Sequence, residues 1–200
     1  MKLNHTLFLF YIVIWIALAI NPFYRDDWWL ENIMVFIAVP IILWSDKRVH
    51  FSHLSLWMLF CFFILHAIGS HYTYSEMPWF SPITQFFGFE RNHYDRLIHF
   101  LFGFLLFLPF HELFSSFWKS KQTALIITFL FLFASSGVYE VIEWIATEMT
   151  NPELGTAFLG TQGDQWDAQK DMALGHLGTI LAFLIWYRKK INKLNDNPTQ

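Results

Sequence analysis

Six long apolar segments constrain this chain more than any other feature of its sequence. They run approximately over 6–20, 28–44, 54–70, 97–114, 123–149 and 171–187. A helix needs roughly 17–25 residues to cross the hydrocarbon core of a bilayer, and most of these segments reach that length with their aromatic ends. The segments are apolar on all sides and do not alternate, which argues against strands. The sequence therefore predicts an all-α, polytopic membrane helix bundle with about six transmembrane helices.

The composition supports one membrane domain. Hydrophobic residues make up 55% of the chain and charged residues only 14%, whereas soluble domains carry about 25% charged residues. We expect a single transmembrane domain over 1–189 and a cytoplasmic polar tail over 190–200. For the first segment an uncleaved helix is the favoured interpretation. The alternative is a signal peptide whose apolar run ends at Ala17-Leu18-Ala19.

Basic residues predict the orientation of the bundle. If the N-terminus is cytoplasmic, nine of the 13 Lys and Arg residues fall on the inner side and four on the outer side. Cytoplasmic loops carry an excess of Lys and Arg, so both termini are expected in the cytoplasm. The long outer loop 70–94 is rich in aromatic residues, and a loop of this kind should lie on the outer interface or fold over the helix ends. The second long outer loop, 150–170, contains glycines and then turns acidic.

Ionisable residues gather at the outer ends of several segments. Counted at 1.5 Å per residue from the inner end of its segment, Glu140 lies roughly 28 Å along its helix, near the outer boundary of a hydrocarbon core about 30 Å thick. Asp95 and Asp171 open the fourth and sixth helices at a similar depth. Ionisable groups near hydrocarbon are costly and often functional. The predicted cluster has as its core Asp95, His99, Glu140, Glu143, Asp167 and Asp171, with Asp164, His66 and His176 as weaker members.

Helical spacing supports a shared site. Asp95 and His99 are four residues apart, and Glu140 and Glu143 are three apart, so each pair lies on one helix face. Carboxylates with an imidazole suit a divalent metal ion. We expect Asp95, His99, Glu140 and Asp171 as metal ligands, and Glu143 and Asp167 as catalytic acid or base residues.

Two alternatives to a metal site remain open. Crowded carboxylates hold protons more readily, which suits a general acid without a metal. In the other interpretation Arg91, Arg96 and Lys170 neutralise some of the acids, while Asp95 and Asp171 cap helix starts.

Four motifs carry a family resemblance. They are HAIGSHYTY at 66–74, RNHYDRLIHF at 91–100, YEVIEW at 139–144 and GTQGDQWDAQKDM at 160–172. Together they resemble the YjdF-type inner-membrane proteins, a bacterial family whose domain has no assigned activity, from about the second helix to the sixth. The family often has Gln and Arg where this chain has Phe102 and His111. The resemblance implies a multi-pass protein of the bacterial inner membrane.

A more distant similarity is to VanZ-like membrane proteins, which are linked to resistance against glycopeptide antibiotics. The shared pattern covers Asp95, Arg96, His99 and Phe100. Glu143 and Asp171 stand where those proteins have Gln and Asn. Both differences make the site more acidic, which favours cation binding, and the similarity implies a role in the cell envelope.

Three functional hypotheses follow, and whether the chain is an enzyme stays open among them. The leading one is an acidic, metal-binding site that faces the periplasm and acts on lipid or lipid-linked head groups by hydrolysis or head-group transfer. The second is a transporter or proton-coupled carrier, which would use the ionisable groups within the membrane. The third is a non-catalytic structural or partner-binding membrane protein. The expected partner in each case is the lipid bilayer, and no nucleic acid is expected.

Overall fold

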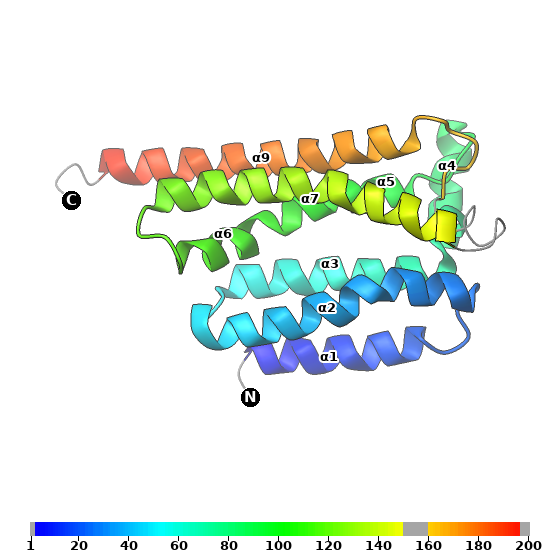
Figure 1. Cartoon of the computed structure of the whole chain (residues 1–200), viewed down its shortest axis with the longest axis horizontal. Helices are drawn as coiled ribbons and strands as arrows, with labels where there is room; N and C mark the ends of the chain where they lie inside the picture. The colour runs from blue at the N-terminus through cyan, green and yellow to red at the C-terminus, as the bar shows by residue number, and fades with distance from the viewer. Residues whose placement is uncertain (1–2, 150–159, 197–200) are drawn as a thin grey trace.

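The computed structural model describes residues 3–149 and 160–196, with side chains as far as Arg188. Its long helices lie side by side along the longest axis of the molecule (Figure 1). They are α1 (Leu3–Leu18), α2 (Arg25–Val49), α3 (His53–Tyr72), α5 (Tyr94–Leu105), α6 (Phe107–Ser115), α7 (Lys121–Met149) and α9 (Asp167–Asp196). Two short turns, η1 (Tyr74–Glu76) and η2 (Pro78–Phe80), precede the short helix α4 (Ser81–Phe87). Segment 150–159 of the expected outer loop and residues 197–200 of the expected tail lie outside the described residues.

The prediction of an all-α, multi-pass membrane protein is confirmed. Four stretches are long and apolar enough to span a bilayer, namely Arg25–Val49, His53–Tyr72, Tyr94–Ser115 and Lys121–Met149. The first helix is apolar but shorter, with 16 residues. The expected sixth segment lies within α9, which continues through Asp196 into the predicted tail. The total of six spans and the cytoplasmic termini stay predictions, although α1 begins and α9 ends at the same end of the bundle (Figure 1).

Local sequence signals explain where several helices begin and end. Helix α2 has Asp26 and Asp27 in its first turn and Lys47 and Arg48 in its last, and these charges oppose the partial charges of the helix ends. Helix α3 begins after Ser52, whose hydroxyl accepts the backbone N–H of Ser55.

The fourth apolar segment, predicted as one helix over 97–114, is two helices in the structure. Helix α5 ends at Leu105 and α6 begins at Phe107. The break follows from Pro109, which has no N–H to donate to the carbonyl of Leu105 and whose ring crowds that turn. The two helices together still make one candidate span.

Helices α5 and α9 pack more extensively on each other than any other pair. Small residues allow this close approach. A Cβ atom on Gly103 would overlap the carbonyl oxygen of Gly175 and the backbone of Thr179, and one on Gly178 would overlap the carbonyl oxygen of Phe100. The backbones of α5 and α9 are therefore in direct contact along this stretch.

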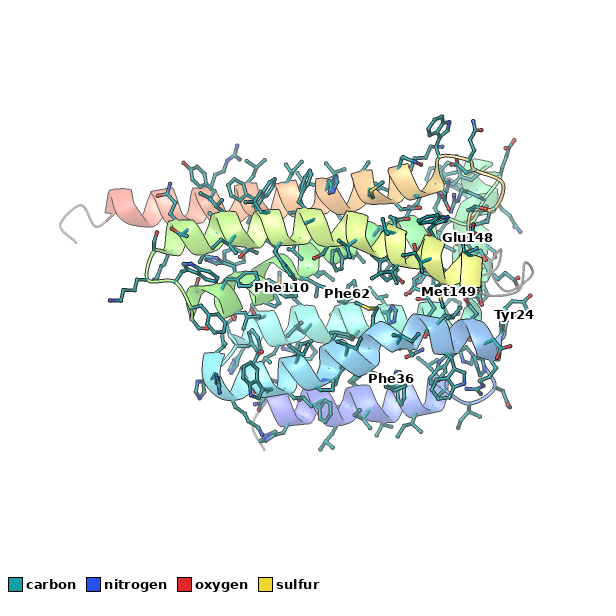
Figure 2. All side chains as sticks on the ribbon, in the orientation of Figure 1. Tyr24, Phe36, Phe62, Phe110, Glu148 and Met149 are labelled. Atoms are coloured by element: carbon teal, nitrogen blue, oxygen red, sulfur yellow. The ribbon has the colours of Figure 1, made fainter. Side chains whose placement is uncertain are left out.

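One end of the bundle, here called the polar end, corresponds to the expected outer side. Helices α2, α5 and α9 begin there, and α3 and α7 end there (Figure 1). Figure 2 places Tyr24, Glu148 and Met149 at this end as well. Within the aromatic segment 73–93, part of the expected loop 70–94, Tyr74 and Met77 are buried, whereas Phe86 and Phe87 are 82% and 62% exposed. Its position at the outer interface of the membrane stays a prediction.

Candidate functional site

Three ionisable side chains meet where α5 and α9 begin, and we call them the α5–α9 triad: Asp95, His99 and Asp171. One oxygen or nitrogen atom from each lies within 4.8 Å of the others. Nε2 of His99 is 3.5 Å from Oδ1 of Asp95 on the same helix face. Asp171, one turn into α9, is 2% exposed. The triad thus depends on two helices that are packed backbone to backbone.

Two glutamates of α7 approach the other side of the His99 ring. Nδ1 of His99 is 3.5 Å from Oε1 of Glu140. His99, Glu140 and Glu143 also offer ligand atoms within 4.8 Å of one another. Glu140 and Glu143 are 9% and 8% exposed. The imidazole therefore lies between two carboxylate groups and presents one ring nitrogen to each.

Two carboxylate oxygens of this region lack hydrogen bonds. Oε1 of Glu140 and Oδ1 of Asp171 are buried and have no hydrogen-bond partner among the residues that the structure describes. The nearest opposite charge to Oδ1 of Asp171 is Nε of Arg96, at 3.9 Å. A buried polar atom without a partner costs about 1–3 kcal/mol, and more when it is charged. These two oxygens are therefore suited to a bound cation or proton.

A second acidic group at the polar end is neutralised by arginine. This group, the arginine layer, consists of Arg91, Arg96, Asp164 and Asp167. Both guanidinium groups contact Asp167, Arg91 through a short ion pair and Arg96 at 3.2 Å. Nη2 of Arg96 also donates to Oδ2 of Asp164 at 2.6 Å. The structure therefore places Asp167, expected as an acid or base, in ion pairs rather than against His99.

Asp164 forms the outer edge of the arginine layer. Nζ of Lys170 donates to Oδ2 of Asp164 at 2.5 Å. This hydrogen bond is the largest of the effects that hold the pKa of Asp164 below its usual range, and the backbone N–H of Trp166 adds to it. Asp164 is thus kept ionised by a lysine and an arginine, and it does not join the α5–α9 triad.

Glu31 on α2 belongs to this region, although it was not among the residues predicted from the sequence. Its carboxylate is 5% exposed and accepts a hydrogen bond of 3.4 Å from the Tyr139 hydroxyl. The Tyr139 ring packs edge-to-face on the His99 ring, with centroids 5.9 Å apart. Tyr139 therefore connects Glu31 to the α5–α9 triad. The available signal was that Glu31 is the one carboxylate within the apolar segment 28–44.

The two weaker histidine candidates have separate partners. Nδ1 of His66 is 2.5 Å from the Tyr74 hydroxyl, and burial raises the pKa of Tyr74, so the phenol stays protonated and donates. His176 stacks on Phe133 with ring centroids 3.5 Å apart and contacts the Phe133 carbonyl oxygen at 2.9 Å. Neither belongs to the groups of possible ligands found among the described residues.

Comparisons with known proteins agree with the motifs in the sequence. The family model described as "Predicted membrane protein (DUF2238)" matches residues 3–192. The chain is 30% identical over 178 residues to the inner membrane protein YjdF of Escherichia coli (strain K12), covering 88% of this chain and 85% of that protein. No solved structure gives a significant match.

These matches confirm the resemblance to YjdF-type proteins, whereas the similarity to VanZ-like proteins stays a prediction. They also agree with the membrane-spanning helices of the structure and identify a multi-pass protein of the bacterial inner membrane. The chain belongs to the DUF2238 family of membrane proteins.

Proposed function

We propose that the α5–α9 triad binds one divalent metal ion on the periplasmic side, and that this site acts on lipid or lipid-linked head groups. The observation that carries the proposal is the convergence of Asp95, His99 and Asp171 within 4.8 Å. Two carboxylates and an imidazole suit metals such as Zn²⁺ or Mn²⁺. Three protein ligands leave a position open for water or substrate, as is usual at catalytic sites.

His99 would bind the metal through Nε2, which faces Asp95. Its other nitrogen, Nδ1, faces Glu140. Histidine ligands commonly donate their second N–H to a carboxylate, which fixes the ring and its tautomer. We therefore assign Glu140 to positioning His99, although the sequence suggested that Glu140 was a ligand.

Glu143 is the proposed acid or base. It lies next to Glu140 and His99 and is not engaged by the arginine layer. When bound, the metal would polarise a phosphoryl or carbonyl oxygen or activate a water molecule. Glu143 would accept or return a proton at its carboxylate. Asp167, whose oxygens contact two guanidinium groups, is better placed to hold Arg91 and Arg96 than to exchange protons.

The distribution of buried charge favours a site at one surface over a carrier. Among the described residues, every buried Asp, Glu, His or Arg belongs to the polar end: Asp27, Glu31, His66, Arg91, Glu140, Glu143, Asp167 and Asp171. The buried polar residues toward the opposite end, such as Ser45, Ser55 and Thr128, carry no charge. A proton or ion path across the membrane would need ionisable groups or water in that half.

Metal content tests the proposal. Purified protein is loaded with Zn²⁺, Mn²⁺ or Mg²⁺, passed through a desalting column and analysed by inductively coupled plasma mass spectrometry. We expect one tightly held ion per chain, lost in Asp95→Asn and Asp171→Asn. The exposed acids Asp26 and Glu148 supply the matched controls Asp26→Asn and Glu148→Gln, which should keep the ion. No stoichiometric binding of any of the three metals by the wild-type protein would disprove the metal site.

The reaction is tested on the same samples. Metal-loaded protein is mixed with vesicles of bacterial phospholipids and of lipid-linked sugars, and the lipid products are separated by mass spectrometry. We expect released or transferred head groups that depend on the metal and on Glu143. Turnover that survives in Glu143→Gln would remove Glu143 from its assigned role.

A further inference from the structure

Helix α4 has a polar face that is directed at the rest of the protein. Ser81, Thr84 and Gln85 are spaced i, i+3 and i+4, so their side chains share one face of the helix. All three line a hollow whose other walls include Arg91 and Asn92, from the segment that leads into α5. The polar side chains of α4 therefore already have protein in front of them.

The opposite face of α4 is apolar and largely exposed. Ile83, Phe86 and Phe87 have the same i, i+3 and i+4 spacing, and they are 41%, 82% and 62% exposed. Trp79, in the preceding turn η2, is 63% exposed. A group of large apolar side chains that is open to solvent usually marks a surface that contacts a membrane or another protein. This face of α4 therefore calls for an apolar partner.

The orientation of α4 favours a membrane as that partner. Figure 1 shows α4 at the polar end of the bundle, where it runs across the direction of the long helices. If those helices span the bilayer, a helix that crosses them at their end lies parallel to the membrane surface. A helix with one polar and one apolar face is suited to that position, with its apolar face in the boundary between head groups and acyl chains.

Exposed tryptophans from three other parts of the chain support the same placement. Trp29 lies in the first turns of α2, Trp144 in the last turns of α7, and Trp166 directly before α9. All three are exposed and lie near the polar ends of their helices. Tryptophan is enriched where transmembrane helices cross the membrane–water interface. Trp79 adds a fourth exposed tryptophan at this end, so the apolar surface around α4 continues the expected lipid-facing belt of the bundle.

Contacts with the start of α5 fix the height of α4. Nδ2 of Asn92 donates to the carbonyl oxygen of Met77 at 2.8 Å, and Oδ1 of Asn92 accepts the backbone N–H of Tyr94 at 3.1 Å. The Phe89 ring packs edge-to-face on the His93 ring, with centroids 4.7 Å apart. Tyr94 is the first residue of a candidate membrane span. The segment that carries α4 is therefore attached to the end of that span.

We infer that α4 is an in-plane membrane anchor, whose apolar face of Ile83, Phe86 and Phe87 lies among the lipids of the leaflet at the polar end. The sequence left open whether this aromatic segment lies on the interface or folds over the helix ends. The inference divides it: Tyr74 and Met77 are buried against the bundle, while α4 inserts into lipid. It goes beyond the proposed function and does not depend on a metal, so it is tested on metal-free protein.

The accessibility of a spin label tests the inference. The single native cysteine is removed by Cys61→Ala, and a nitroxide is attached at Phe86→Cys or at the neighbouring, exposed Gln85→Cys. Full-length protein in phospholipid vesicles is studied by power-saturation electron paramagnetic resonance with oxygen and with a water-soluble nickel chelate. We expect the label at position 86 to lie about 5–10 Å inside the head-group boundary. The label at position 85, on the polar face, should collide with the nickel chelate several-fold more often.

Two results would overturn the inference. Equal nickel access at positions 85 and 86 would place the apolar face in water. Protection of the label at position 86 from both oxygen and nickel would mean that protein covers this face. In that case dipolar broadening between labels would identify a second copy of the chain as the cover, and its absence would identify a different protein.

A reporter on the same helix tests whether the aromatic rings hold α4 in the membrane. With the label at Ile83→Cys, the double variant Phe86→Ser/Phe87→Ser should raise nickel access several-fold. Both rings are mostly exposed, so the melting temperature of this variant in detergent should match that of its parent. Phe10→Ser, at a residue of α1 that is 59% exposed, is the matched control and should leave nickel access at position 83 unchanged. Unchanged access in the double variant would overturn the assignment of the anchor to these rings.

Discussion

The arginine layer and the α5–α9 triad each contain two aspartates at the polar end, but only the aspartates of the arginine layer pair closely with arginine. Asp164 and Asp167 contact Arg91 and Arg96. Asp95 and Asp171, by contrast, share one histidine, and Oδ1 of Asp171 has no hydrogen-bond partner in the described part of the chain. We therefore expect the arginine layer to stabilise the structure, and we propose that the α5–α9 triad receives a cation.

The largest expected effect is loss of stability when the arginine layer is broken. The double variant Arg91→Met/Arg96→Met removes both partners of the buried Asp167 and should destabilise the protein by about 3–5 kcal/mol, because a buried charge is left without its counter-charge. Metal-free Asp171→Asn should melt at or above the wild-type temperature, because the only arginine contact of Asp171 is a distant one, with Nε of Arg96 at 3.9 Å, and its Oδ1 makes no hydrogen bond with the described residues. Thermal unfolding in detergent, with the exposed Lys119→Met as control, compares them. Equal destabilisation by both variants would contradict the distinction between a stabilising arginine layer and an α5–α9 triad that does not stabilise the metal-free protein.

The second prediction separates a ligand from the residue that positions it. Glu140→Gln should keep one metal per chain but weaken its affinity by about 10–100-fold, as expected when the carboxylate partner of a histidine ligand is removed. Asp171→Asn should abolish stoichiometric binding. Titration with a competing chelator measures both affinities. If Glu140→Gln also abolishes binding, Glu140 is a ligand, and the metal lies on the α7 side of His99.

The third prediction concerns the helix packing beneath the α5–α9 triad. In Gly103→Ala the new Cβ would overlap the backbone of α9, which should cost about 1–3 kcal/mol of stability and lower metal affinity without changing a ligand. Gly137→Ala is the matched control, because its Cβ would meet only Sδ of Met172 at an ordinary 3.5 Å. Thermal unfolding and the chelator titration are measured together. Unchanged metal affinity in Gly103→Ala would show that the triad does not depend on this contact.

The smallest expected effect is at the outer edge of the arginine layer. Lys170→Met removes the hydrogen bond that does most to lower the pKa of Asp164 from its usual 3.8. Since the folded-state pKa lies below the unfolded value, the stabilisation is present above pH 3.8 and is lost as the pH falls through the lowered pKa. The wild type should therefore melt slightly higher than Lys170→Met near neutral pH, and the two should converge in strong acid. A difference in melting temperature between the wild type and Lys170→Met that grows as the pH falls would contradict this prediction.

Much of the fold was predictable because the length and apolarity of a single segment are enough to predict a transmembrane helix. The break at Leu106 could also have been predicted, since Pro109 stands four residues after Leu105. The aromatic segment 73–93 could be recognised but not assigned. Tyr74 is buried and Phe86 exposed because of which side chains of the segment face the helix ends. The composition of the segment does not predict this.

The sequence predicted at which end of the helices the acidic residues lie, but not which partner each acidic residue contacts. Helical spacing places Asp167 and Asp171 on one face, yet Asp167 contacts arginines and Asp171 approaches His99. Glu31 reaches the same region from α2 through Tyr139, although its position in the sequence is far from the other motifs.

By itself the sequence determined that this chain lies in a membrane, that it is helical, and that its buried charges gather at one end. These properties follow from hydrophobic segments that must satisfy their own backbone hydrogen bonds in lipid. Only the tertiary structure decided which acids meet arginine and which meet His99. That choice depends on the rotation and spacing of helices from distant parts of the chain, set here by the close contact of α5 with α9 at Gly103 and Gly178.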